Sequence, residues 1–161
     1  MPNLGNLPSN LPVSRDDGRA DHLPGAQLAS MPLPTTDRHI IDLSQHESEW
    51  RVLYIYPMTG RSDVALPEGS DLNPGARGCT PQSCSFRDHA TALADLGAEI
   101  VGMSVQDSEY QREMVDHLHL PYTVVSDADR AFGDLHEAPG HEGHHARWAT
   151  RPIAQTTHPH R

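Results

Sequence analysis

One apolar run near the middle of the chain limits the possible folds more than any other feature. Residues 50–57, Trp-Arg-Val-Leu-Tyr-Ile-Tyr-Pro, combine aromatic and branched side chains with a single charge. This is the strongest strand signal in the sequence. Because the run is nearly continuously apolar, it predicts a strand that is buried on both faces, as is typical of parallel sheets.

Strand and helix patterns alternate along the chain. Short apolar stretches predict further strands at 38–44, 99–105 and 122–126. Apolar residues at helical spacing predict helices at about 80–96, 108–118 and 127–135. In the first two of these helices, Thr80 and Ser108 are the expected N-caps. The alternation predicts an α/β fold with a central parallel sheet flanked by helices, in which ligands bind beyond the carboxyl ends of the strands.

Composition indicates that not all 161 residues belong to this fold. Aromatic residues make up only 5% of the chain, and many of its 14 prolines lie near the beginning. We therefore expect a flexible arm over 1–22 and a single domain over 23–135, with local packing through Leu28 and Met31. Residues 136–161 are rich in histidine and contain no apolar run, which predicts a disordered tail without a strand.

Charge and hydropathy exclude several classes of function. The formal net charge is −10, which argues against a nucleic-acid partner because such proteins usually carry a basic face. All 12 basic residues are arginines, so lysine-dependent chemistry is excluded. No apolar stretch reaches 18 residues and the first 15 residues lack the pattern of a secretion signal, so we expect a cytoplasmic protein with no membrane partner. Two cysteines in a reducing compartment favour a redox, catalytic or metal-binding role.

The two cysteines, Cys79 and Cys84, lie at the beginning of the first expected helix. The free amides and partial positive charge of a helix N-terminus stabilise a thiolate, so Cys79 is expected to be more acidic than a free cysteine, whose pKa is about 8.5. Five residues of intact helix separate two Cα atoms by roughly 8–9 Å. A disulfide requires less than about 7 Å, so the pair can bond only if the first turns of the helix unwind.

This arrangement suits an oxidation cycle. Cys79 would attack an electrophile such as a peroxide and become a sulfenic acid, which would then condense with Cys84. By spacing alone, two cysteines five residues apart are more often buried and inert than catalytic, and both interpretations are open at this point.

The segment 78–88, Gly-Cys-Thr-Pro-Gln-Ser-Cys-Ser-Phe-Arg-Asp, resembles the peroxiredoxins. The resemblance is to the bacterioferritin-comigratory and plant Q-type branch of the alkyl hydroperoxide reductase and thiol-specific antioxidant superfamily of redoxins. It extends over roughly residues 23–135. It implies a thioredoxin-like fold and the thiol-dependent reduction of hydrogen peroxide or organic hydroperoxides. It also places Cys79 as the peroxidatic cysteine and Cys84 as the resolving cysteine, which form an intramolecular disulfide.

The same resemblance implies the partners of the reaction. The disulfide is expected to be reduced by a thioredoxin-like dithiol, and the substrate is a hydroperoxide. We expect a monomer or a dimer. No cofactor and no metal are expected at the site.

The chain departs from the family pattern before the first cysteine. The family usually has a threonine three residues before the peroxidatic cysteine and a proline seven before it, where this chain has Ala76 and Leu72. Thr59 would take the place of that threonine if the loop at about 60–75 were an insertion that folds back to the site.

The chain also departs from the family at its C-terminal end. The family continues with a β-hairpin and a closing helix, which here are missing or divergent because residues 133–161 do not match them. In the family the hairpin carries an arginine that stabilises the thiolate. Arg147 and Arg151 are available, but neither aligns with it.

Other interpretations of the same residues remain open. In a second peroxiredoxin branch the later cysteine, here Cys84, would be peroxidatic. A chain that keeps the cysteine pair without the supporting residues would be an inactive or truncated peroxiredoxin-like protein, or a non-enzymatic redox sensor. The cysteine spacing does not match a structural zinc site. A histidine-rich tail of this kind usually binds nothing specific; the residues that a divalent metal would use there are His141, His144, His145, Glu137 and Glu142.

Overall fold

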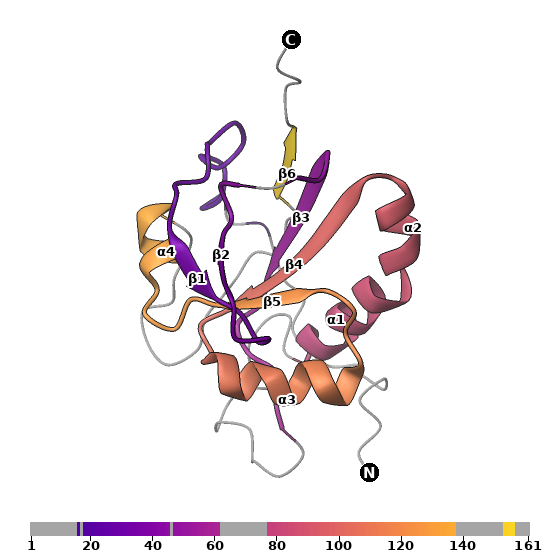
Figure 1. The fold of residues 1–161 in the computed structure, drawn as a ribbon. Helices are drawn as coiled ribbons and strands as arrows, with labels where there is room; N and C mark the ends of the chain where they lie inside the picture. Colours follow the sequence, from indigo (N-terminus) through magenta and orange to yellow (C-terminus); the bar gives the residue numbers. More distant parts are fainter. Residues whose placement is uncertain (1–15, 17, 46, 62–76, 138–152, 157–161) are drawn as a thin grey trace.

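The structure is a computed structural model, and it describes residues 16, 18–45, 47–61, 77–137 and 153–156 (Figure 1). The elements, in chain order, are β1 (Pro32–Pro34), β2 (Ile40–Asp42), β3 (Trp50–Ile55), α1 (Cys79–Asp88), α2 (Ala90–Asp95), β4 (Ala98–Ser104), α3 (Ser108–Leu118), β5 (Thr123–Ser126), α4 (Ala131–Leu135) and β6 (Ile153–Thr156). Strands alternate with helices from β3 onward, which confirms the α/β class expected from the sequence.

The central sheet has four strands in the order β5-β4-β3-β6. β3, β4 and β5 run parallel, with Leu53 opposite Val101 and Gly102 opposite Val124, whereas β6 is antiparallel to β3. β1 and β2 form a separate antiparallel hairpin. The hairpin is tied to β5 by the amide of Thr36, which donates to the carbonyl of Val124 at 3.0 Å.

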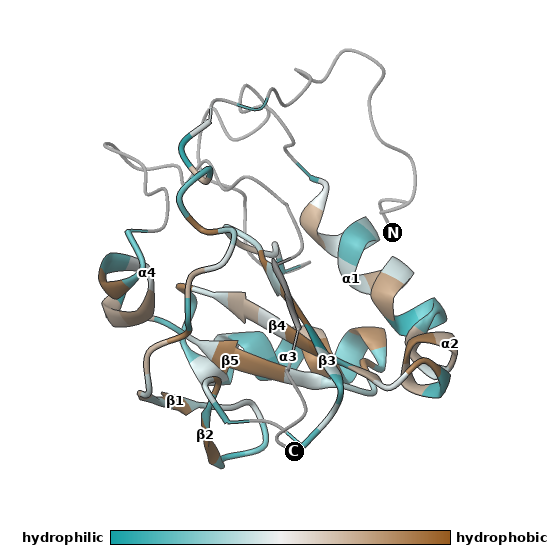
Figure 2. Ribbon diagram, turned by 90° about the horizontal axis from the view of Figure 1, so that it is seen from above, coloured by the Kyte–Doolittle hydropathy of each residue, from teal (hydrophilic) through white to brown (hydrophobic). Residues whose placement is uncertain are grey.

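Two apolar cores lie on opposite faces of the sheet. On one face the parallel strands pack with α1, α2 and α3 around Tyr54 and Tyr56. On the other face they pack with the β1–β2 hairpin and α4 around Phe132, and Leu28 and Met31 join this core as expected. In Figure 2 the apolar colour runs along the strands between these two layers.

Alternation along β3 assigns its side chains to the two cores. Leu53 belongs to the hairpin side, whereas Tyr54 and the following Tyr56 belong to the helix side, because successive side chains of a strand point to opposite faces. This confirms a strand that is buried on both sides. Its one charged side chain, Arg51, is 7% exposed and lies 2.7 Å from Glu99, measured from Nε to Oε1.

The single helix expected at 80–96 is in fact two helices. α1 and α2 meet at His89, whose ψ of 5° departs from the helical value of about −42°. α1 begins directly at Cys79 after an N-cap at Gly78, so the expectation that Thr80 is the cap is wrong. No side chain caps α1, and the amides of its first turn therefore remain available to the site.

α3 has the bounds expected from the sequence, but not the expected cap. The carboxylate of Asp107, rather than the hydroxyl of Ser108, accepts from the amide of Tyr110 at 2.7 Å. α4 covers only the second half of the helix expected at 127–135. None of the helices in the described ranges is long and apolar enough to cross a membrane.

The C-terminal segment contains a strand that the sequence does not indicate. β6 lies within residues 136–161 and pairs with β3, with Ile153 opposite Leu53. The expectation that this segment contains no strand is therefore wrong for the four residues of β6, whereas the division of the chain into an arm, a domain and a tail stays a prediction. Backbone pairing with a buried neighbour can hold a segment in a strand although its own side-chain pattern is weak.

Candidate active site

Cys79 lies where the chain returns to the sheet after β3, at the carboxyl ends of the parallel strands. As the first residue of α1 it is half-buried and packs against the core that contains Tyr54 and Tyr56. Two backbone amides, those of Met58 and of Cys79 itself, each act to lower the pKa of its thiol. The strand end and the helix beginning therefore both contribute amides to one sulfur atom.

The Cys79 thiol is nevertheless less acidic than the sequence predicts. Burial raises its pKa above the ordinary value of a cysteine, because a thiolate loses hydration in an apolar environment. The amides of Met58 and Cys79 lower the pKa, but by less than burial raises it. The expectation of an acidic Cys79 is therefore wrong: it considered the helix N-terminus and not the aromatic core against which the helix packs.

Cys84 lies on the same helix as Cys79, and both thiols are free. Because α1 is unbroken between them, five helical residues place their Cα atoms roughly 8–9 Å apart, beyond the reach of a disulfide. Arg87 lies close to Cys84: its pKa is raised mainly by a hydrogen bond with Asp88, and the charge of a Cys84 thiolate adds to this effect. A Cys84 thiolate would therefore lie near a cation.

Thr59 lies at the edge of the site and is almost fully buried. Its amide donates to Oε1 of Gln106 at 2.9 Å, and its hydroxyl lies 3.4 Å from the same oxygen. Thr59 directly follows Met58, whose amide faces Cys79. The hypothesis that Thr59 replaces the family threonine stays a prediction, but the residue is close enough in the chain to fill that role.

Three hydroxyl groups that the sequence did not single out converge on the middle of α1. Ser83, which is completely buried, accepts a hydrogen bond from the hydroxyl of Tyr54 at 3.1 Å and donates to the carbonyl of Cys79 at 3.0 Å. The hydroxyl of Tyr122 donates to the Ser83 carbonyl at 2.9 Å and lies 3.0 Å from the Tyr54 hydroxyl. We refer to Tyr54, Ser83 and Tyr122 as the hydroxyl cluster.

Gly102 on β4 makes room for the Tyr54 ring. A Cβ atom at this position would lie 2.8 Å from the Tyr54 hydroxyl oxygen, which is closer than real contacts allow. The ring also stacks on Phe86 of α1 with centroids 4.6 Å apart and on Tyr56 at 5.7 Å. The position of the Tyr54 hydroxyl is thus fixed from the sheet and from the helix.

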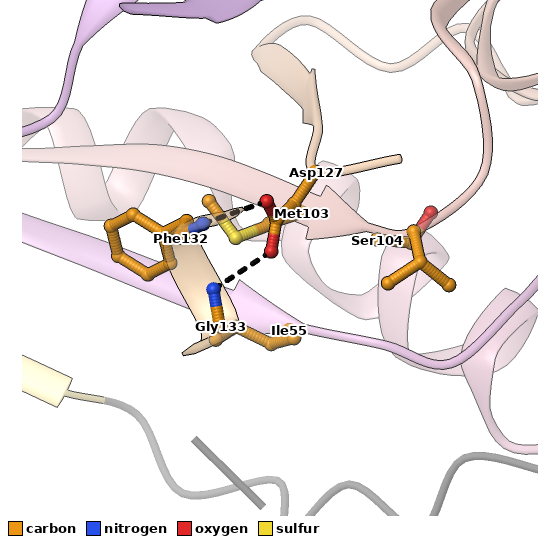
Figure 3. A pocket seen from close by; sticks show the side chains of 7 residues that line it. Ile55, Met103, Ser104, Asp127, Phe132 and Gly133 are labelled. Carbon is orange, nitrogen blue, oxygen red and sulfur yellow. Dashed lines mark hydrogen bonds between the residues drawn. The ribbon is translucent and has the colours of Figure 1, made fainter. Parts of the chain in front are cut away.

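Neither cysteine lines either of two depressions on the described part of the surface. The hollow in Figure 3 lies at the ends of β4 and β5, where the Asp127 carboxylate accepts from the amides of Phe132 and Gly133, both at 2.9 Å, and it has no room for a ligand. A wider groove of about 300 Å³ is lined by Thr36, Asp37, Arg38, Arg112, Val115 and Asp116. Neither depression includes a residue of the hydroxyl cluster.

Comparison with known families gives one match that spans the cysteine segment. The family model described as "AhpC/TSA family" matches residues 72–152, which is half of the chain and includes both cysteines. The chain belongs to the AhpC/TSA family. Within this family it is of the peroxiredoxin Q and bacterioferritin-comigratory type, as the resemblance of the cysteine segment implied.

Curated relatives of this family match only part of their own length. A chloroplastic peroxiredoxin Q from Suaeda salsa is 31% identical over 103 residues, which is 64% of this chain and 41% of that protein. A chloroplastic peroxiredoxin Q from Arabidopsis thaliana is 37% identical over 76 residues, or 47% of this chain and 28% of that protein. The chain thus matches about two fifths or less of the length of these relatives.

Solved structures of the AhpC/TSA family show the same thioredoxin-like fold. The peroxidoxin BcpB from Mycobacterium tuberculosis superposes with a TM-score of 0.58 at 22% identity, covering 81% of this chain and 75% of that one. A variant of the peroxiredoxin Q from Xanthomonas campestris superposes with a TM-score of 0.57 at 15% identity, covering 92% and 87%. At these identities the likeness establishes the fold.

Several residues weighed in the sequence lie outside the described ranges. These are Leu72, Ala76, Arg147, Arg151, His141, Glu142, His144 and His145. Among the residues that the structure does describe, no three histidine, cysteine, aspartate or glutamate side chains converge on a common point that would hold a metal ion.

Proposed function

We propose that this protein is a thiol peroxidase in which Cys79 is peroxidatic and Cys84 is resolving. The proposal rests mainly on one observation: Cys79 is the first residue of α1, where the backbone amides of Met58 and Cys79 act to lower the pKa of its thiol, and Cys84 follows on the same helix. Amides at this position stabilise the thiolate that attacks and the charge that develops during the attack. Peroxiredoxins in general reduce hydroperoxides with electrons from thioredoxin-type dithiols, and we propose both partners for this chain.

The proposed cycle has three steps. The Cys79 thiolate attacks the terminal oxygen of a hydroperoxide, the O–O bond breaks, and the alkoxide or hydroxide leaves and takes a proton, which gives a Cys79 sulfenic acid. The Cys84 thiolate then attacks the sulfenic sulfur, an S–S bond forms, and water leaves after the departing hydroxide takes a proton. A dithiol reductant restores both thiols by disulfide exchange and is itself oxidised to a disulfide.

Stopped-flow oxidation of the reduced full chain by hydrogen peroxide tests the assignment of both cysteines. Cys79→Ser and Cys84→Ser are matched single-atom substitutions on one helix. We expect fast oxidation that disappears in Cys79→Ser and that stops at a sulfenic acid, detected by mass spectrometry, in Cys84→Ser. The reverse pattern would make Cys84 peroxidatic. Oxidation of all three proteins at the rate of a free thiol would overturn the proposal.

A non-enzymatic redox sensor is the second candidate, and the raised pKa of Cys79 favours it. A largely protonated thiol reacts slowly with peroxide, which suits a single regulatory oxidation better than turnover. The two functions differ when peroxide is added repeatedly in the presence of a dithiol reductant. A peroxidase consumes many equivalents of peroxide per protein chain, whereas a sensor consumes one or two and stops.

A further inference from the structure

The hydroxyl cluster holds α1 at the residue next to Cys84. Ser83 is completely buried, and both its side chain and its backbone carbonyl are engaged by tyrosines from two different strands or strand ends. Its hydroxyl also donates to the carbonyl of Cys79. The cluster therefore connects the first turn of α1, the position before Cys84, the strand β3 and the beginning of β5.

A count of protons shows that the cluster contains one more polar contact than it has protons. The three hydroxyl groups carry three protons, but the structure contains four contacts among them and their carbonyl partners. Burial raises the pKa of Tyr122 to about 12 and that of Tyr54 further, so neither loses its proton near neutral pH. When Tyr54, Ser83 and Tyr122 each donate once, the contact of 3.0 Å between the two tyrosine oxygens has no proton of its own.

Disulfide formation requires α1 to open at this place. Cα atoms roughly 8–9 Å apart must approach to within about 7 Å, so the residues between Cys79 and Cys84 must leave the helical conformation. Ser83 is one of these residues, and it cannot move with Cys84 unless its contacts with Tyr54 and Tyr122 break. A sulfenic acid that waits for this opening stays exposed to a second peroxide molecule, which would oxidise it to a sulfinic acid.

We infer that the tyrosine hydroxyls of the cluster regulate the resolving step by setting how readily α1 opens between Cys79 and Cys84. Tyr54 and Tyr122 are thus positioning residues: they act through Ser83 and do not touch the peroxide. The inference rests on the proposed function for its peroxide chemistry, but the opening of α1 exists with or without that chemistry.

Tyr122→Phe is the most selective change. Tyr122 is half-buried, and its ring packs beside Tyr54 with centroids 6.0 Å apart, a contact that phenylalanine keeps. When the Tyr122 hydroxyl is removed, two hydroxyl contacts remain: Tyr54 donates to Ser83, and Ser83 donates to the carbonyl of Cys79. Each has its own proton, so neither remaining hydroxyl group lacks a partner. What is lost is one hydrogen bond to the Ser83 carbonyl, which corresponds to about a fivefold change in an opening equilibrium.

The test compares Tyr122→Phe with Tyr110→Phe, a tyrosine on α3 outside the hydroxyl cluster. In the reduced proteins, hydrogen exchange of the α1 amides should be about fivefold faster in Tyr122→Phe and unchanged in Tyr110→Phe. In stopped-flow traces, the disulfide-forming phase after peroxide oxidation should accelerate by the same factor, and the sulfinic fraction at high peroxide should fall. The rate of the first, sulfenic-forming phase should be unchanged.

The possible outcomes separate the inference from the proposed function. Equal exchange and equal disulfide rates in Tyr122→Phe and wild type would overturn the inference. If peroxide oxidises neither protein, the proposed function fails. The same Cys79–Cys84 disulfide can then be formed with diamide, which oxidises thiols and needs no peroxide site. A faster disulfide with diamide in Tyr122→Phe alone would support the inference under that condition, and equal rates would overturn it.

Discussion

Gln106 and Thr59 are joined at both polar atoms of the Thr59 backbone. The amide of Thr59 donates to Oε1 of Gln106 at 2.9 Å, and Nε2 of Gln106 donates to the carbonyl of Thr59 at 3.1 Å. The carboxamide of Gln106 thus takes the place of a neighbouring strand for this one residue. It fixes the backbone directly after Met58, whose amide acts to lower the pKa of the Cys79 thiol.

The first prediction follows from this pairing. Gln106→Glu keeps an oxygen for the Thr59 amide but places a second, negatively charged oxygen against the Thr59 carbonyl, so the backbone at Met58 should loosen. We expect Cys79 to react with peroxide about three- to tenfold more slowly. The exposed Gln45, far along the chain on the hairpin side, provides the matched control Gln45→Glu. Equal rates for both variants in stopped-flow oxidation would contradict this role of Gln106.

The second prediction concerns pH. Burial places the pKa of Cys79 in the folded protein above the value in the unfolded chain, which is about 8.5. The thiolate fraction, and with it the rate of alkylation by iodoacetamide in the Cys84→Ser protein, should therefore still increase as the pH rises through 8.5. A plateau reached below pH 7 would be inconsistent with a buried thiol.

The same shift affects the free energy of unfolding. Because the folded protein holds the Cys79 proton more tightly than the unfolded chain, the stabilisation is complete below the unfolded pKa of about 8.5 and is lost as the pH rises through the higher folded pKa. Cys79→Ser removes this contribution. Urea unfolding of both proteins at several pH values should show that the free energy of unfolding of wild type falls relative to that of Cys79→Ser at alkaline pH.

The sheet could be predicted from sequence because its strands carry strong local patterns. Residues of β3 alternate between two cores, and each face is apolar, so the run at 50–57 has no other stable environment. β6 could not be predicted in this way, because residues 153–156 lie in a segment without an apolar run and the strand is defined by its pairing with β3. The interruption at His89 could not be predicted either, because it lies in the backbone angles of His89 while the helical pattern of apolar residues continues across it.

The candidate site was predictable in part. The cysteine spacing and the helix signal are local, so Cys79 and Cys84 could be assigned to one helix from sequence. The contact between Tyr122 and Ser83 joins residues 39 positions apart, and that between Tyr54 and Ser83 joins residues 29 apart. No periodicity of a single sequence reports such contacts. The only local indication of the hydroxyl cluster is a serine on the apolar side of a helix, between two cysteines.

The third prediction concerns the buried ion pair at the other end of β3. Arg51 bonds Glu99 and also donates to the carbonyls of Leu43 and Gln45. Arg51→Ala would leave Glu99, which is 32% exposed, without its partner and two carbonyls without a donor. We expect a loss of about 2–4 kcal/mol in the free energy of unfolding, measured in urea. Arg130→Ala, which breaks a more exposed pair with Asp134, should cost less than about 1 kcal/mol.

The fourth prediction uses Gly102 to move Tyr54 from the sheet side. In Gly102→Ala the new methyl group would lie 2.8 Å from the Tyr54 hydroxyl oxygen and 2.9 Å from Cζ. The ring cannot simply shift, because Phe86 and Tyr56 stack against it. Overpacking of this kind should cost about 1–3 kcal/mol in the free energy of unfolding and should displace the Tyr54 hydroxyl from Ser83.

A double-mutant cycle identifies Tyr54 as the cause. Tyr54→Phe removes the oxygen that meets the methyl group first, so Gly102→Ala should be less destabilising in the Tyr54→Phe background than in wild type. If Gly102→Ala lowers the free energy of unfolding equally in both backgrounds, the methyl group clashes with the backbone or with other side chains instead. Hydrogen exchange of the α1 amides provides the second measurement: in Gly102→Ala it should accelerate at the residues around Ser83 more than at the amides of α3, because the displaced hydroxyl no longer holds α1.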